Sequence, residues 1–299
     1  MVETFEMKSS VLLFAKEFVK KGEGREFKSH RARFLFLRST MHAQKIAELL
    51  KEAVYANLPK KVAVPFSGGL DSATLAKIAS QKAEVLLITA GTEKSADVKA
   101  AREVAGEMGL PHETVIMDKE QILSTYEKCK KIMPGELLKV ELMVPLYFVC
   151  EKARERGFET IMLGSGAEEV FIGYGRYFEY LEEGMDLQKI LSWEVETLKE
   201  RDCKRLDAVA GEFGISTLYP FLYQPLSSFA LSLPLSARLG SRKNKKPLLR
   251  EAAKLLGVPK TAYTRPKKAM QYGSGVHKIL LKEFGEGVKG VSYRSNPPF

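Results

Sequence analysis

The feature that most limits the fold of this chain is an alternation of two residue patterns between residues 62 and 163. Apolar runs of strand length are followed by segments in which apolar residues recur at helical spacing. The predicted strands are 62–66, 84–89, 113–117 and 159–163, and the predicted helices are 71–80, 96–108, 119–131 and 142–156. Such an alternation is typical of a parallel sheet with helices on both faces. We therefore predict an α/β fold whose ligands bind beyond the carboxyl ends of the strands.

The segments on either side of this region have other patterns. Downstream, the chain is mainly helical, with predicted helices at 186–212, 223–233, 246–256 and 276–284. Upstream, the extended-looking runs 10–15 and 33–37 flank a polar stretch, which predicts a β-hairpin or another small appended element. An amphipathic helix is expected at 43–56. We accordingly divide the chain into an N-terminal extension, residues 1–42, and one α/β domain with a helical C-terminal part, residues 43–299.

A glycine-rich loop, Ser67-Gly68-Gly69-Leu70-Asp71-Ser72, joins the first predicted strand to its helix. The glycines let backbone amides approach a ligand, the serine hydroxyls donate hydrogen bonds, and the helix dipole favours negative charge. The Asp71 carboxylate would repel a phosphate unless a divalent cation lay between them, which indicates Mg²⁺ bound with a polyphosphate. The alternative is a structural glycine turn with a serine helix cap, which fits any isolated Ser-Gly-Gly.

The net charge of +10 is concentrated in one segment. Between Arg238 and Lys268 there are eleven basic residues and one acidic residue, Glu251. This segment suits a phosphate-rich ligand, either ATP or RNA, and the alternative is a solvated basic surface. The end of the segment, Arg265-Pro266-Lys267-Lys268, runs into a turn of small residues at 271–275, which is more typical of a binding site than of a helix face.

Composition excludes several classes of protein. No stretch is long and apolar enough to cross a membrane, and the first residues lack the apolar segment of a signal peptide. The cysteines Cys129, Cys150 and Cys203 are scattered, which indicates neither a disulfide framework nor a zinc site. We expect a cytoplasmic protein that does not associate with membranes.

Several ordered motifs resemble one enzyme family. The loop at 67–72 is not a Walker loop, which requires GxxxxGK[ST], and resembles the pyrophosphate loop of N-type ATP pyrophosphatases. The string Gly164–Tyr174 resembles the SGEGxDExFxGY signature of asparagine synthetases. The strings around Asp97, at Pro220-Phe221-Leu222, at Lys246-Pro247-Leu248-Leu249-Arg250 and at Arg265-Pro266-Lys267 are similar to further segments of that family. The resemblance covers residues 43 to about 280 and implies an adenine nucleotide α-hydrolase-like, Rossmann-like domain.

The resemblance also implies a reaction, two cofactors and a set of site residues. An asparagine synthetase-like ligase uses ATP and Mg²⁺ to adenylate aspartate or a related acid, releases pyrophosphate, and transfers the acyl group to ammonia or an amine. Cations near the α-phosphate stabilise the charge that builds there, and the implied cation is Lys267. Asp71 and Glu168 are implied magnesium ligands. The implied nucleotide and pyrophosphate contacts are Ser67, Gly68, Gly69, Asp71, Ser72, Asp97, Gly164 and Arg265.

The signature departs from the family at the position of the base. Ser165 stands where the family string has the Glu that helps to deprotonate the amine nucleophile, and Glu168 stands where it has Asp. A serine hydroxyl is a poor base at neutral pH without an activating partner. Glu168 and Glu169 are therefore candidate catalytic carboxylates. Alternatively, the nucleophile differs, as in β-lactam synthetases, where this position is not Glu.

The sequence is compatible with several partners and with more than one function. Glutamine-hydrolysing members carry a catalytic Cys directly after the initiator Met, whereas this chain has Val2, so we expect nitrogen from ammonia, from an amine, or from a separate glutaminase subunit. A homo-oligomer is compatible with the sequence. The alternative function is an N-type ATP pyrophosphatase that modifies tRNA, although the paired cysteines of tRNA thiolases are absent and nucleic acid is the less favoured partner. A third alternative is a non-catalytic nucleotide-binding protein, which Ser165 would explain.

Overall fold

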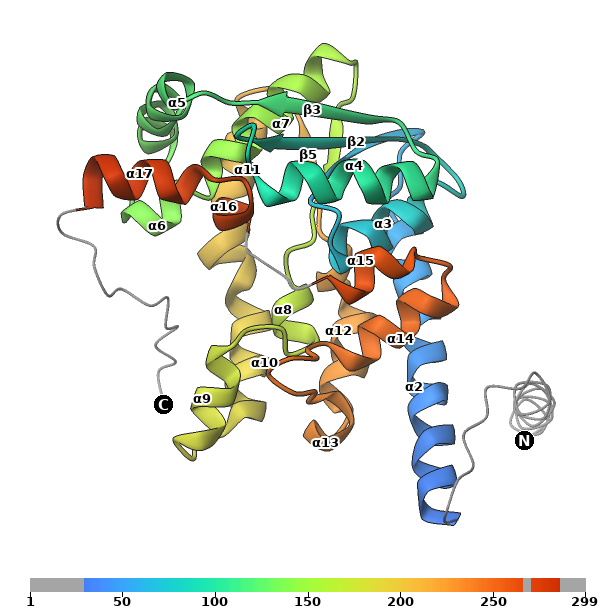
Figure 1. Cartoon of the computed structure of the whole chain (residues 1–299). Helices are drawn as coiled ribbons and strands as arrows, with labels where there is room; N and C mark the ends of the chain where they lie inside the picture. The colour runs from blue at the N-terminus through green and yellow to red at the C-terminus, as the bar shows by residue number, and fades with distance from the viewer. Residues whose placement is uncertain (1–29, 266–269, 286–299) are drawn as a thin grey trace.

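The computed structural model describes residues 30–265 and 270–285 and contains a five-stranded parallel sheet (Figure 1). The strands lie in the order β3-β2-β1-β4-β5. Their bounds are β1 Lys61–Pro65, β2 Glu84–Gly91, β3 His112–Ile116, β4 Thr160–Met162 and β5 Ser216–Leu218. The four predicted strands are thus confirmed with small shifts at their ends, and the parallel sheet is confirmed. The fifth strand was not predicted.

The apolar run in the central strand β1 reflects its burial on both faces of the sheet. Val62, Ala63 and Val64 are fully buried, because helices cover both faces of the sheet at this strand. β1 pairs with β2 from Lys61 opposite Glu84 onward, and it meets β4 on its other side.

The chain reverses direction across the sheet at β1. It runs outward from β1 through β2 to β3, and then returns to the opposite side of β1 to form β4 and β5. The loops that follow β1 and β4 therefore leave the sheet in opposite directions. In open parallel sheets this switch point creates a crevice beyond the carboxyl ends of the strands, where ligands bind.

Two hydrophobic clusters cover the two faces of the sheet. Helices on one face contribute Leu50, Leu75 and Ala101, and helices on the other contribute Ile122 and Leu146. The helices of the first face are α2 His30–Tyr55, α3 Leu70–Ala79, α4 Ala96–Met108 and α14 Pro247–Leu255, and those of the second are α5 Lys119–Ile132, α7 Met143–Glu155, α11 Lys204–Gly211 and α17 Val276–Phe284.

The predicted helical C-terminal part is confirmed, and its helices lie below the sheet in the view of Figure 1. Its longer helices are α10 Leu187–Leu198 and α12 Gln224–Ser232, and its third cluster includes the fully buried Ile190 and Leu191. The remaining short elements are α6 Leu137–Val140, α8 Ala167–Val170, α9 Arg176–Glu182, η2 Pro220–Leu222, α13 Leu235–Arg238, α15 Lys260–Thr264 and α16 Met270–Gly273. The predicted helix 186–212 is interrupted by a π-helical turn, η1 Lys199–Cys203, which separates α10 from α11.

The predicted extended run at 33–37 is wrong. These residues belong to helix α2, which begins at His30 and continues through the expected helix 43–56 to Tyr55. No glycine or proline lies between His30 and Tyr55, so nothing in the chain stops the helix from extending toward its N-terminus. The proposed boundary between 42 and 43 therefore falls inside one helix, while the run 10–15 lies outside the described residues.

No helix within residues 30–265 and 270–285 is both long and apolar enough to span a membrane.

Candidate active site

A cavity of about 1160 Å³ opens at the switch point between β1 and β4. Its volume exceeds the roughly 300–1,000 Å³ of single small-molecule sites, so it has room for a nucleotide and a second ligand. One wall consists of the loops that follow β1 and β4, and another consists of the start of α14 and the end of α15. The elements of the two walls come from distant parts of the chain.

The glycine-rich loop between β1 and α3 requires glycine at its second position. Gly68 has a φ of 68°, and a Cβ at this position would lie 2.7 Å from the carbonyl oxygen of Ala100. Both the backbone angle and the close approach of α4 thus require glycine. The N-cap of α3 is Gly69, which has no side chain to cap the helix, and the Ser67 hydroxyl accepts from the Gly69 amide over 3.4 Å. Ser67 and Ser72 line the cavity on either side of this helix start.

A buried lysine ties the two loops together. The Lys246 ammonium Nζ lies 2.8 Å from both carboxylate oxygens of Asp71 and 3.1 Å from Glu168 Oε2. The three side chains are 5%, 13% and 7% exposed. Burial lowers the pKa of Lys246 below its ordinary value, and the Asp71 carboxylate opposes part of that shift. One ammonium group is therefore shared by two nearly dehydrated carboxylates.

Backbone geometry places each member of this cluster. Lys246 is in the left-handed region with φ 56°, directly before Pro247 starts α14, so its side chain turns back toward the sheet. Gly173 leaves the space in which the pair forms, since a Cβ there would lie 1.6 Å from Glu168 Oε2 and 2.3 Å from Lys246 Cε. Gly166, with φ 93°, begins the short helix α8 that carries Glu168.

The carboxylates fit the kind of magnesium site that nucleotide enzymes use. Asp71 and Glu168 belong to different loops, yet both reach one cation, the Lys246 ammonium. Among the described residues, no cluster of three or more His, Cys, Asp and Glu side chains could hold a metal. Mg²⁺ commonly takes one or two protein carboxylates and completes its octahedron with phosphate oxygens and water, which matches this donor set.

Asp97 and Arg265 contact each other at the edge of the cavity. Arg265 donates to Asp97 Oδ1 over 2.8 Å and to the backbone carbonyl oxygens of Ala96 and Ser67. Asp97 is 4% exposed, and a Cβ on Gly273 would lie 1.9 Å from its Oδ2. Both side chains line the cavity, and their predicted contact with the nucleotide stays a prediction. Their ion pair joins the C-terminal part of the chain to the start of α4, while the hydrogen bond to Ser67 joins it to the loop after β1.

Two further predicted positions have different outcomes. Gly164 lines the cavity directly beside Asp71, since a Cβ there would lie 3.4 Å from the Asp71 Cβ. Lys267 belongs to residues 266–269, outside the described part of the chain, so its role stays a prediction.

The two carboxylates that could replace the missing base have different surroundings. Glu168 is engaged by Lys246, whereas Glu169 Oε2 has no hydrogen-bond partner among the described residues. Burial raises the pKa of Glu169 to about 7, and the Glu194 and Asp202 carboxylates add to the rise while Arg176 opposes it. Ser165 lies between β4 and α8, is half-buried and lines the same cavity.

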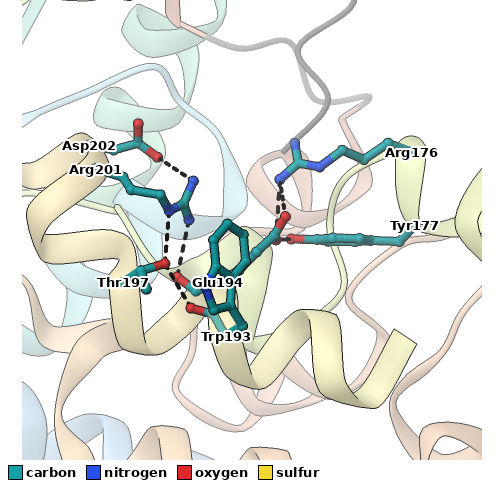
Figure 2. A network of polar contacts seen from close by, with 7 residues as sticks. All are labelled: Arg176, Tyr177, Trp193, Glu194, Thr197, Arg201 and Asp202. Atoms are coloured by element: carbon teal, nitrogen blue, oxygen red, sulfur yellow. Dashed lines mark hydrogen bonds and ion pairs between the residues drawn. The ribbon is translucent and has the colours of Figure 1, made fainter. Parts of the chain in front are cut away.

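Sequence reasoning missed a polar wall formed by α9 and α10 (Figure 2). The fully buried Glu194 accepts hydrogen bonds from Arg176 over 3.0 and 3.2 Å and from the hydroxyl of Tyr177. The Arg176 guanidinium lies 3.9 Å from the centre of the Tyr174 ring, and both residues line the cavity. The available signal was Glu194 itself, a carboxylate on the apolar side of a predicted helix.

Asp202 and Arg205 extend this wall and were also missed. Both line the cavity, from η1 and α11 respectively. Arg205 donates to the backbone carbonyl oxygens of Met133 and Pro134, which fixes its guanidinium at the rim. Their positions within a continuous helical pattern carried no signal of a site.

The matching family model and two relatives found by sequence share one description. A family model described as asparagine synthase matches residues 45–187 and 179–289. The "Putative asparagine synthetase (glutamine-hydrolyzing) 1" of Methanocaldococcus jannaschii is 31% identical over 256 residues, covering 74% of this chain and 47% of that protein. Asparagine synthetase B of Escherichia coli K12 is 25% identical over 258 residues, covering 80% and 46%. The chain thus spans about half the length of these relatives.

Among solved structures, NMN synthetase from Francisella tularensis is similar with a TM-score of 0.42 and 14% identity, over 87% of this chain and 99% of that chain.

Proposed function

Because the chain belongs to the asparagine synthase family, we propose that it is an ATP-dependent ligase that activates a carboxylate and then forms an amide. In the first step the carboxylate attacks the α-phosphate of ATP, so that an acyl-adenylate forms and pyrophosphate leaves. In the second step ammonia or an amine attacks the acyl carbon, so that the amide forms and AMP leaves.

One observation carries the proposal: the Asp71–Lys246–Glu168 cluster lies beside the uncapped start of α3. The amides at that helix start would bind pyrophosphate oxygens, and Ser67 and Ser72 would add hydroxyl donors. Mg²⁺ bound by Asp71 and Glu168 would supply positive charge to the phosphates. The Lys246 ammonium adds a fixed charge at the same place, where it limits repulsion between the carboxylates and the polyphosphate.

The polar wall suggests the class of acid that is activated. Asp202 presents a carboxylate to the cavity, with 31% of its side chain exposed. A carboxylate at a cavity wall suits the ammonium group of an amino acid. We therefore propose an amino-acid substrate, aspartate or a related acid, with its ammonium group at Asp202.

The second step requires a group that takes a proton from the amine. Ser165 is not suited to this, and Glu168 is engaged by Lys246. Glu169 lines the cavity one residue further along and is the candidate that we favour.

The test is ATP–pyrophosphate exchange across a panel of carboxylic acids, repeated with ammonia, with amines and with tRNA. We expect exchange that depends on one amino acid, and amide formation when a nitrogen donor is added. Exchange or AMP release that depends on tRNA alone would support a tRNA-modifying enzyme instead. ATP binding without turnover under every condition would overturn the ligase and support a non-catalytic nucleotide-binding protein.

A further inference from the structure

The polar wall contains an unusual element of secondary structure. Helices α10 and α11 would form one continuous helix, but the π-helical turn η1 separates them. Its backbone hydrogen bonds join residues five apart, as the Lys204 amide bonding to the Lys199 carbonyl shows. A π-helical turn accommodates one extra residue, changes the direction of the side chains that follow, and commonly lies at functional sites.

One side chain fastens this turn to the α-helical turn before it (Figure 2). Arg201 Nε donates to the Thr197 hydroxyl over 2.9 Å, and Arg201 Nη2 donates to the Glu194 carbonyl oxygen over 3.2 Å. The Thr197 hydroxyl in turn donates to the carbonyl oxygen of Trp193 over 2.8 Å. The guanidinium also lies 5.1 Å from the centre of the Trp193 ring. Arg201 thus links the π-helical turn to three residues of α10.

The turn of α10 that Arg201 contacts is itself held in place. The Glu194 backbone accepts from Arg201, while its fully buried side chain accepts from Arg176 and Tyr177 of α9 (Figure 2). A buried charged pair with several hydrogen bonds is rigid, because breaking any contact leaves a dehydrated charge. The turn of α10 that Arg201 grips is therefore held from the opposite side.

The residue that the π-helical turn carries into the cavity is Asp202. Arg201 Nη1 lies 3.7 Å from Asp202 Oδ2, so the same guanidinium that closes the turn also contacts the carboxylate. Asp202 lines the cavity and Arg201 does not. Arg201 therefore acts on a ligand in the cavity indirectly, either through the turn and Asp202 or through Glu194, which holds the cavity-lining Arg176.

We propose that Arg201 is a positioning residue of the substrate subsite: it holds the π-helical turn that presents Asp202 to the ammonium group of the acid to be activated. The identity of that ligand rests on the proposed function. The mechanical part, that Arg201 maintains the turn and the direction of Asp202, does not depend on it.

The first experiment tests the mechanical part without any substrate. Crystal structures of the wild-type chain and of Arg201→Ala are compared, with Lys204→Ala as control, because Lys204 follows the same turn but makes only an exposed pair with Glu200. We expect residues 199–203 of Arg201→Ala to return to α-helical hydrogen bonding and Asp202 to leave the cavity wall. An unchanged π-helical turn with Asp202 in place would overturn the proposal.

The second experiment tests the effect on substrate choice. ATP–pyrophosphate exchange is measured with the preferred amino acid and with its analogue that lacks the amino group. We expect Arg201→Ala and Asp202→Asn each to reduce the preference for the amino acid, on the order of a hundred-fold, with KM for ATP unchanged. The double variant should be no worse than Asp202→Asn alone, because both act through one group. Arg201→Lys, which keeps the charge but not the forked donors, should lie between.

Three results would contradict the positioning role: Arg201→Ala keeps the full preference, it slows both acids equally, or its effect adds to that of Asp202→Asn. If Arg201→Ala does not fold, Thr197→Val replaces it, since this change removes one of the two acceptors of the Arg201 guanidinium while keeping the side-chain shape. If no acid supports exchange in the wild-type chain, the proposed function fails while the structural comparison still decides the role of Arg201.

Discussion

Lys246 Nζ lies 2.8 Å from both carboxylate oxygens of Asp71, although 175 positions separate the two residues in the chain. The contact joins the first loop of the sheet to the start of a helix near the other end of the domain. Since Glu168 shares the same ammonium group, three loops meet at a single charge. Because the cluster is buried and joins distant parts of the chain, it is the most direct target for mutation.

Replacement of Lys246 by Ala should destabilise the protein and abolish ATP–pyrophosphate exchange. Removal of one member of a buried ion pair leaves the others dehydrated and uncompensated, which typically costs about 3–5 kcal/mol of unfolding free energy. Denaturant titration and the exchange assay measure the two effects. Lys45→Ala is the matched control, because Lys45 is an exposed lysine of α2 that forms a surface pair with Glu48 and does not line the cavity, and it should change neither quantity measurably. Restored stability in the Lys246→Ala, Asp71→Asn double variant would tie the loss to this pair.

Replacement of Gly173 by Ala should lower exchange activity without unfolding the protein. The added methyl group would lie 1.6 Å from Glu168 Oε2, so the Glu168–Lys246 pair must move apart. A displacement of about 1 Å in a catalytic site can cost on the order of a hundred-fold in rate. The control is Gly106→Ala in α4, where a Cβ meets nothing within 4 Å. Wild-type activity in Gly173→Ala would show that the position of Glu168 does not matter for activation.

The buried carboxyl of Glu169 should make the stability of the metal-free protein depend on pH. Its pKa is raised from 4.5 to about 7 in the folded chain, so the folded state holds the proton more tightly than the unfolded state. A group of this kind contributes stability below pH 4.5, and that contribution is lost as the pH rises toward 7. We expect the wild-type chain to lose roughly 3 kcal/mol relative to Glu169→Gln across this interval. Denaturant titration at several pH values in a chelator measures the difference. Parallel curves for the two proteins would contradict the raised pKa.

Single substitutions of Lys267 and of its neighbour Lys268 test which of the two lysines has the predicted role. Lys267→Ala should slow adenylation on the order of a hundred- to a thousand-fold, with little effect on ATP binding, because its charge matters most when charge builds on the α-phosphate. Lys268→Ala should leave the rate near that of the wild type. Exchange kinetics and ATP binding are measured for both. The opposite result would place the catalytic lysine one position further along the chain.

The sequence predicted those parts of the fold in which apolar residues follow a regular pattern. Strand β1 could be predicted because Val62 to Val64 are buried on both faces of the sheet and so must all be apolar. Strand β5 was not, because Ser216–Leu218 is three residues long, only partly buried and mixed in polarity. The helix at 30–42 was missed because its apolar residues, including Phe34 and Leu35, also fit an extended run.

The candidate site was also predicted only in part: residues in local motifs were found, and residues placed by the long-range fold were not. The loop at 67–72 and the string around Glu168 were found because glycines and carboxylates at fixed spacing are a chemical pattern. Asp202 was not found, since its direction depends on a π-helical turn that no residue pattern announces. Lys246 was noticed as part of a basic segment, but its contact with Asp71 follows from a left-handed backbone and a long-range fold that the sequence does not display locally.

The distance along the chain between the two sides of the cavity has a consequence for synthesis. Arg265 and Ser67 are 198 positions apart, and Arg265 and Asp97 are 168 apart. On the ribosome the N-terminal part emerges first, so the first three strands can pair while the residues that complete the cavity are still being translated. During that interval the Asp71 and Glu168 carboxylates lack the ammonium group that they share in the finished protein. We therefore expect nucleotide binding to be among the last properties that a nascent chain acquires, after its sheet is already in place.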